Sequence, residues 1–334
     1  MKKNDYKKAT QKISKYLLNK DILSAYEYGS YKNPGLSDID LFIIIKNKKY
    51  NLLKKIIDDL KKKDLSFFFE YSTIMIADTN FLKNIILFDD LNLKKIFGKK
   101  IDINKYKSYK KELELLSVLE WIPERTLRLR ENIDNFNKVN LRQHLGLLNS
   151  LKYTYIKLNH YISETLINLF CKKIDQLRKD KDILKKRHEI LIFSKKILKY
   201  TQSLMYRFSE DLSVKNLNIK INGELIMTFP NNYKIFFTNK QNLRPIENTI
   251  FVPLIYSSPF AFHLTKKNSL YRTLKGNFKL LENYKINYKN KKINFILNKR
   301  NKLISNNIDL LKKNNLIKGI YKFGWYLKKY EKKI

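Results

Sequence analysis

The uninterrupted apolar run at residues 41–45 (LFIII) limits the fold of this chain more than any other stretch. It is too short for a helix, and its β-branched and aromatic residues favour a strand. A strand that is apolar on both faces is expected inside a sheet, between covering helices. The run follows Asp38, Ile39 and Asp40 directly. The sequence therefore predicts a buried strand whose charged start lies at the rim of a sheet.

The two aspartates before this strand form the first candidate site. Side chains alternate along a strand, so we expect Asp38 and Asp40 on one face, about 7 Å apart, with Ile39 packed behind them. Like charges held together repel each other unless a cation neutralises them. The pair is therefore predicted to bind a hard divalent metal through its oxygens.

The residues before the aspartates predict a phosphate site. Residues 23–28 (LSAYEY) favour a short strand that ends at Gly29, where the chain is free to turn sharply and approach a ligand. Ser30 adds a hydroxyl and an amide, and converging amides in such a turn bind anions. We assign the same nucleotide contact to Lys32 and Ser37 in the segment that follows. The alternative is that this segment is an ordinary turn without a ligand.

At residues 28–30 (YGS) and 37–41 (SDIDL) the chain resembles the nucleotidyltransferase superfamily that includes DNA polymerase β. Members of that family carry an apolar residue, Gly-Ser, a spacer, and Asp-x-Asp set among apolar residues. The resemblance covers roughly residues 20–100. The spacer at residues 31–37 is shorter than the family's usual one, which predicts a tighter loop or a different grip on the substrate.

The resemblance implies a third carboxylate from a later strand. Glu70 is our candidate, because it lies in the aromatic stretch 65–71, which favours a strand, and a buried acid there needs a partner or a metal. Asp64 and Asp78 are the alternatives for this role. The alternative is that Glu70 lies on an edge strand, points to solvent and has no catalytic role.

The activity that the resemblance implies is transfer of NMP from an NTP, such as ATP, to a hydroxyl acceptor, with release of pyrophosphate. We expect two Mg²⁺ ions, or Mn²⁺ in their place, held by Asp38, Asp40 and Glu70. A small molecule or sugar is favoured as acceptor over RNA, because the Arg-Arg-Asp-Phe motif of bacterial CCA-adding and poly(A) enzymes is absent. The alternatives are an RNA-directed terminal nucleotidyltransferase and a non-catalytic nucleotide or nucleic-acid binding protein of the same fold.

Composition limits the remaining possibilities. A formal charge of +38 attracts anions at low salt, but the lysines are spread along the chain with many Asn and Ile, as a coding sequence rich in A and T would produce.

The single cysteine, Cys171, fits a reducing compartment. No apolar stretch approaches the roughly 20 residues of a spanning helix. We expect a soluble, cytoplasmic protein without membrane insertion, and no protein partner is inferred. The four histidines lack metal-ligand spacing.

The hydrophobic pattern divides the 334 residues into three predicted domains. The fold class is α/β (α+β): a nucleotidyltransferase-like mixed sheet flanked by helices, then a helical bundle, then a smaller strand-containing C-terminal module. The boundaries are 1–108 for the catalytic domain, 109–213 for the helical domain and 214–334 for the module.

Within these domains we predict the following elements from periodicity and turn signals. The first domain is predicted to have helices over 5–19 and 49–63, strands at 23–28, 41–45, 65–71 and 73–77, a helix after Thr79, and an exit beginning at Phe97-Gly98. The second has helices over 109–133, 139–171 and 173–210. The third has a hairpin at 219–226 that turns at Asn222-Gly223, strands at 233–238 and 249–256, and a helix over 302–333.

Four arginines of the helical domain, Arg125, Arg128, Arg130 and Arg142, allow two interpretations. Guanidinium groups grip phosphate well, which would make them a triphosphate or acceptor clamp. Alternatively they form a solvated helix face beside neighbouring glutamates.

Overall fold

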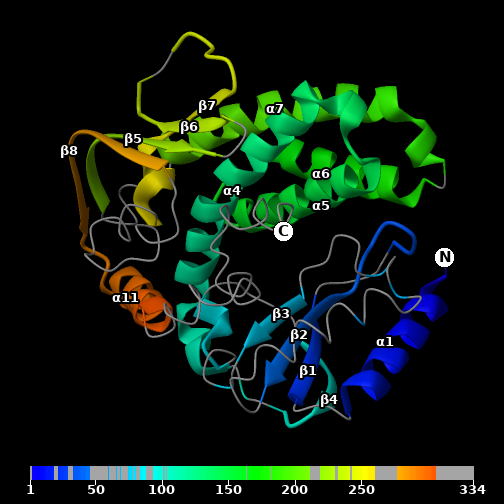
Figure 1. The fold of residues 1–334 in the computed structure, drawn as a ribbon. Coiled ribbons are helices and arrows are strands. Elements are labelled where there is room, and N and C mark those ends of the chain that lie inside the picture. The colour runs from blue at the N-terminus through cyan, green and yellow to red at the C-terminus, as the bar shows by residue number, and fades with distance from the viewer. Residues whose placement is uncertain are drawn as a thin grey trace. The chain divides into compact units, whose positions relative to one another are not determined.

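The structure is a computed structural model of the chain, drawn in Figure 1. It describes residues 2–18, 22–28, 33–45, 59, 65, 68, 74–77, 79, 83–87, 93–100, 102, 104–162, 164–180, 182–210, 219–229, 232–240, 243–259 and 277–305. These residues belong to two compact units, the first reaching to Lys110 and the second covering Lys111–Ser305. Both units contain helices and a sheet, which confirms a mixed α+β class.

The first unit is built on a four-stranded mixed sheet. Its strands are β1 (Ile22–Tyr28), β2 (Asp40–Ile45), β3 (Ile74–Ala77) and β4 (Lys94–Gly98), in the order β3-β2-β1-β4. β1 runs antiparallel to β2 and β4, and β2 runs parallel to β3. The strand predicted from the apolar run is thus an inner strand, and residues 41–44 are fully buried, as expected.

Helix α1 (Lys3–Leu18) covers part of this sheet and contacts β1 and β4 (Figure 1). Its buried residues Tyr6, Ala9, Ile13 and Leu17 recur at helical spacing, so one face of the helix is apolar. The predicted helix is confirmed. Of the helix predicted over 49–63 only Asp59 is described; it is helical, and its carboxylate accepts a hydrogen bond from the Tyr16 hydroxyl at 2.6 Å.

Two predictions in this unit need correction. The exit predicted from Phe97-Gly98 to about residue 108 begins too early, because both residues end the edge strand β4, while the first unit reaches to Lys110. The sequence did not predict this strand, because its first residues are exposed lysines that resemble a loop. Lysine is nevertheless common on edge strands. Of the strand predicted over 65–71 only Leu65 and Phe68 are described, and neither is in a strand. The Phe68 amide donates to the Leu65 carbonyl at 2.9 Å, and Phe68 is in a 3₁₀ conformation.

The second unit begins with four helices: α4 (Lys110–Asp134), α5 (Leu141–Leu158), α6 (Thr165–Lys179) and α7 (Arg187–Phe208). The Tyr155 hydroxyl of α5 is hydrogen-bonded to Thr201 of α7, and Phe170 of α6 packs on Tyr200 of α7 at 4.8 Å between ring centroids. These contacts join α5, α6 and α7 side by side (Figure 1).

The helix boundaries predicted at residues 171 and 173 are wrong. The chain leaves the helix after Leu158 and again after Lys179. At the first break the Asn159 side chain accepts a hydrogen bond from the Glu164 amide at 3.1 Å, and at the second Asp180 accepts one from the Asp182 amide at 2.9 Å. Short polar side chains that bond nearby amides compete with the helix in this way.

A second four-stranded sheet follows in the same unit. Its strands are β5 (Ile219–Thr228), β6 (Lys234–Phe237), β7 (Thr249–Val252) and β8 (Asn277–Tyr288), in the order β7-β6-β5-β8. Helix α11 (Lys291–Ser305) comes next. The Arg300 guanidinium of α11 donates to the buried Glu120 carboxylate of α4 at 2.5 Å.

The hairpin predicted at Asn222-Gly223 is wrong. Both residues lie inside the continuous strand β5, where the register with β8 shifts between Asn222 and Glu224. Gly223 has a φ of +94°, so the glycine serves a β-bulge and not a turn. The strand predicted at 249–256 ends at Val252, and the turn of 3₁₀ helix at Leu254–Ser257 follows Pro253. Helix α11 contains residues 302–305 of the helix predicted over 302–333, and the rest of that prediction lies outside the described residues.

Shorter 3₁₀ turns connect these elements at Ile85–Leu87, Asn104–Tyr109, Phe136–Lys138 and Ile183–Lys185. Over the described residues, none of the helices has both the length and the apolar character needed to cross a membrane.

Candidate functional site

The end of β1 and the start of β2 meet at one edge of the first sheet. Tyr28, the last residue of β1, is paired in register with Asp40, the first residue of β2. Residues directly opposite each other in an antiparallel pair have their side chains on the same face. The chain continues from Tyr28 directly into Gly29, so the two predicted motifs leave the sheet at the same edge.

The aspartate segment alternates as a strand should. Ile39 is 1% exposed, and its amide donates to the Phe68 carbonyl at 2.8 Å, whereas Asp38 and Asp40 are partly exposed. The burial thus alternates over residues 38–40, and β2 itself begins at Asp40. A shared face for Asp38 and Asp40 stays a prediction.

The turn before Asp38 is fixed to helix α1 by Tyr6. The fully buried Tyr6 donates its hydroxyl hydrogen to the Ser37 carbonyl at 2.6 Å and accepts one from the Gly35 amide at 3.1 Å. Gly35 has a φ of +90°, which favours glycine. The Ser37 amide donates to the Asn33 carbonyl at 3.1 Å. Both backbone groups of Ser37 thus have partners in the protein.

Phe68 holds the other side of the same segment. Its ring packs edge-on against Tyr6, with 5.0 Å between ring centroids, while its carbonyl accepts the Ile39 amide. Tyr6 and Phe68 therefore support the aspartate segment from two elements that are distant in sequence.

The remaining predicted site residues lie outside the described part of the chain. These are Gly29, Ser30, Lys32, Glu70 and the alternatives Asp64 and Asp78. Among the residues that are described, no three His, Cys, Asp or Glu side chains are grouped closely enough to hold a metal ion. The third carboxylate thus stays a prediction.

Sequence reasoning overlooked one buried acid, Glu27. It lies on β1 with 5% of its surface exposed, in register with Leu41 of β2 and Lys94 of β4. The signal was an acid inside a short apolar strand. Because side chains alternate, Glu27 is on the opposite face from Tyr28 and so from Asp40. It therefore does not join the aspartate pair.

The arginines that were considered as a clamp make contacts within the protein. Arg125 donates to the Ser150 carbonyl at 2.8 Å, Arg128 pairs with Glu124 at 3.3 Å, and Arg130 pairs with Asp134 at 2.9 Å. Arg142 is only 7% exposed. Arg128 and Arg130 thus match the solvated helix face beside acidic neighbours, whereas Arg142 is buried and Arg125 bonds to α5.

Comparisons of this chain with models of protein families, with curated proteins and with solved structures gave no match. The fold is therefore defined by its own topology, as a mixed helix-and-sheet protein with one partly exposed aspartate pair at the edge of its first sheet.

Proposed function

We propose that the chain is a metal-dependent nucleotidyltransferase that transfers NMP from an NTP to a hydroxyl acceptor and releases pyrophosphate. The observation that carries this proposal is the register of Tyr28 with Asp40, which brings the start of the Gly-Ser segment to the sheet edge where the aspartates begin. Phosphate-binding amides and metal-binding carboxylates have to be adjacent for a metal to share the phosphate charge. We place the activity in the cytoplasm, since the single cysteine suits a reducing compartment.

The aspartates suit Mg²⁺ in their donor chemistry. Two partly exposed carboxylates offer hard oxygen ligands, while Ile39 anchors the backbone between them. When bound, Mg²⁺ would neutralise charge on the triphosphate and lower the pKa of the acceptor hydroxyl. Asp38 and Asp40 would hold the metal next to the α-phosphate, and Ser30 and Lys32 would bind the outer phosphates.

The described residues near Glu70 and Asp78 favour Glu70 as the third carboxylate. Phe68, two residues before Glu70, is hydrogen-bonded to Ile39 between the two aspartates. In contrast Ala77, directly before Asp78, pairs with Ile44, about 13 Å along β2 from Asp40. We therefore propose Glu70 as the third ligand, in the role of a base or metal ligand.

The test is release of pyrophosphate from labelled NTPs with Mg²⁺, offered small hydroxyl compounds and RNA as separate acceptors. We expect Asp38→Asn and Asp40→Asn to reduce turnover by about 100-fold or more with unchanged far-UV circular dichroism. Asp182→Asn is the matched control, because Asp182 is an exposed residue of the second unit. Parent-like turnover in both site variants would reject the proposal.

A second pair of variants tests the third ligand. Glu70→Gln should abolish turnover as the aspartate variants do, and Asp78→Asn should leave it near the parent value. The reverse result would move the third ligand to Asp78. NTP binding without turnover on any acceptor would point to a nucleotide-binding protein.

A further inference from the structure

The second unit contains a cavity of about 550 Å³ that the sequence did not predict. The C-terminal end of α4 and the turn after it form one wall of the cavity, and the residues just before β6 and β7 form the other wall. Its lining residues are Glu131, Asn132, Asn135, Lys138, Val139, Tyr233 and Asn248. The volume falls within the range of about 300–1,000 Å³ that is typical of small-molecule sites.

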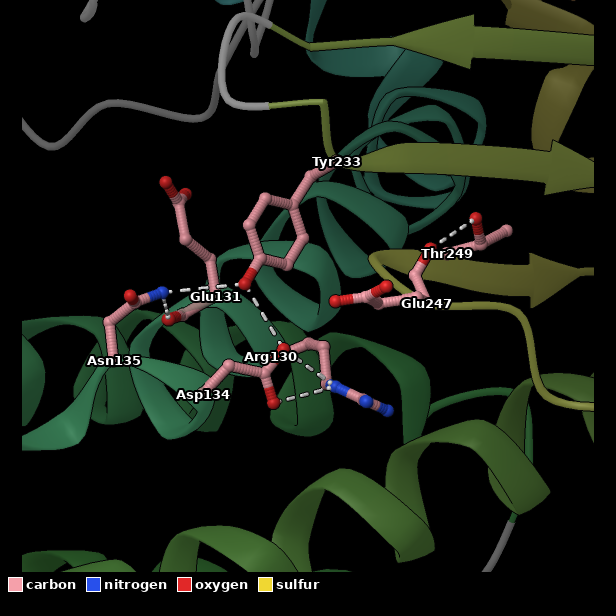
Figure 2. Close-up of polar contacts among 7 residues, drawn as sticks. All are labelled: Arg130, Glu131, Asp134, Asn135, Tyr233, Glu247 and Thr249. Atoms are coloured by element: carbon pink, nitrogen blue, oxygen red, sulfur yellow. Dashed lines mark hydrogen bonds and ion pairs between the residues drawn. The ribbon is translucent and has the colours of Figure 1, made fainter.

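The two walls are tied together through Tyr233. Its hydroxyl donates to the Asp134 carboxylate at 3.1 Å and accepts from the Asn135 amide at 3.4 Å, and Arg130 holds Asp134 at 2.9 Å. Figure 2 shows Tyr233 extending from the start of β6 toward this group on α4. Arg187 donates to the Val139 carbonyl at 2.9 Å and fixes the turn. The cavity is therefore preformed.

The lining carries no net charge. Glu131 contributes one negative charge and Lys138 one positive charge, although the chain as a whole has a formal charge of +38. The Asp134 carboxylate behind the lining is paired with Arg130. Glu247 also extends toward Tyr233 from the turn before β7 (Figure 2). Because the charge of the lining is balanced and Asp134 is paired, the cavity offers no unbalanced cation that would favour an anionic ligand.

The polar groups of the lining are mixed donors and acceptors. The Asn135 amide nitrogen donates to the Glu131 carbonyl at 3.0 Å and to the Tyr233 hydroxyl, so Asn135 offers its oxygen as an acceptor. Glu131 adds acceptors, and Lys138 and the Asn248 carboxamide add donors. A hydroxyl group both donates and accepts, so it pairs with such a surface, whereas an apolar ligand would leave these groups unpaired.

Stacking is not available to a ligand in this cavity. Tyr233 is the aromatic residue of the lining, and it is only 5% exposed. Recognition of nucleobases usually relies on an open aromatic face, which argues against a base as the ligand.

We infer that this cavity binds a neutral, polyhydroxylated small molecule such as a monosaccharide or cyclitol. Glu131 and the Asn135 oxygen accept hydrogen bonds from its hydroxyl groups, and Lys138 and Asn248 donate to them. The inference is independent of nucleotidyl transfer, because all lining residues belong to the second unit and binding needs neither nucleotide nor metal.

The test is saturation-transfer difference NMR on the full chain without nucleotide or divalent metal. The probes are methyl α-D-glucopyranoside, methyl α-D-galactopyranoside, methyl α-D-mannopyranoside and myo-inositol, with glycine and uridine as comparison ligands. We expect saturable binding of at least one polyol and none of the comparison ligands. Absence of binding for all four polyols overturns the inference, as does binding of glycine or uridine in their place.

Matched variants locate the binding. Asn248 has a φ of +55°, so Asn248→Gly removes the carboxamide while it keeps the backbone conformation. Asn232, with a φ of +60°, is exposed and outside the lining, which makes Asn232→Gly its control. Glu131→Gln is matched by Glu189→Gln on the exposed surface of α7.

We expect Asn248→Gly and Glu131→Gln each to weaken polyol binding by about tenfold, the effect of one lost hydrogen bond. The two control variants should bind as the parent does. Equal affinity in all four variants would place the polyol elsewhere and overturn the inference.

Discussion

Acidification should destabilise the second unit through one residue, His144 of α5. The ring is fully buried. Ser194 donates its hydroxyl hydrogen to the Ile190 carbonyl at 2.7 Å, so its oxygen accepts from His144 Nε2, also at 2.7 Å. The Asn132 amide then donates to Nδ1 at 3.1 Å. Both ring nitrogens are satisfied in the neutral form, which leaves no acceptor for a second proton.

Burial, together with the smaller effect of the nearby Arg187 guanidinium, lowers the pKa of His144 from 6.5 to about 4. Between these values the unfolded chain binds a proton that the folded protein does not, so the free energy of unfolding falls as the pH decreases below 6.5. It stops falling below about pH 4, where both states are protonated. This linkage gives a loss of about 2 kcal/mol between pH 7.5 and pH 5, and about 3 kcal/mol at its limit.

Urea unfolding of the parent and of His144→Gln at pH 7.5 and pH 5 measures this loss. Glutamine can bond to the same neighbours but does not titrate, so the parent should lose about 2 kcal/mol more than the variant. His188→Gln, at an exposed position of α7, is the control and should behave as the parent. An NMR titration of His144 near pH 6.5, or the same pH dependence in parent and variant, would refute the reasoning.

Three further predictions concern stability, and each is measured by chemical denaturation. Arg300→Ala should cost about 3–5 kcal/mol, because it leaves the buried Glu120 carboxylate without its partner, and the double variant Arg300→Met with Glu120→Leu should recover most of that loss. Tyr6→Phe should cost about 1–3 kcal/mol through its two hydrogen bonds to the turn, and an unchanged midpoint would contradict this. Gly98→Ala should cost more than Gly35→Ala: both have positive φ, but only at Gly98 would the new Cβ lie 2.2 Å from a backbone oxygen.

Local patterns were enough to predict the elements around the aspartates. The apolar face of α1 and the apolar run of β2 are encoded in a few consecutive residues, and both are buried as expected. The position of Asp38 and Asp40 at the start of β2 follows from that run. The hydrogen bond from Tyr6 to the Ser37 carbonyl could not be predicted from local patterns, because it joins residues 31 positions apart.

Elements that depend on distant partners were missed. Asn222-Gly223 has the residues of a tight turn, but β5 continues through it because it pairs along its length with β8, far along the chain. Strand β4 has a polar start that reads as a loop, and it becomes a strand by pairing with β1. The cavity residues come from three separate stretches with no common motif, so only the folded chain brings them together.

The central claim is that Asp38 and Asp40 hold a divalent metal beside a nucleotide. Electron paramagnetic resonance of Mn²⁺ tests it most directly, by titrating the parent, Asp38→Asn, Asp40→Asn and the control Asp182→Asn in the presence of a non-hydrolysable NTP. The account predicts Mn²⁺ binding by the parent and the control, and weakening by about 100-fold in each site variant. Equal Mn²⁺ affinity in all four proteins would contradict it.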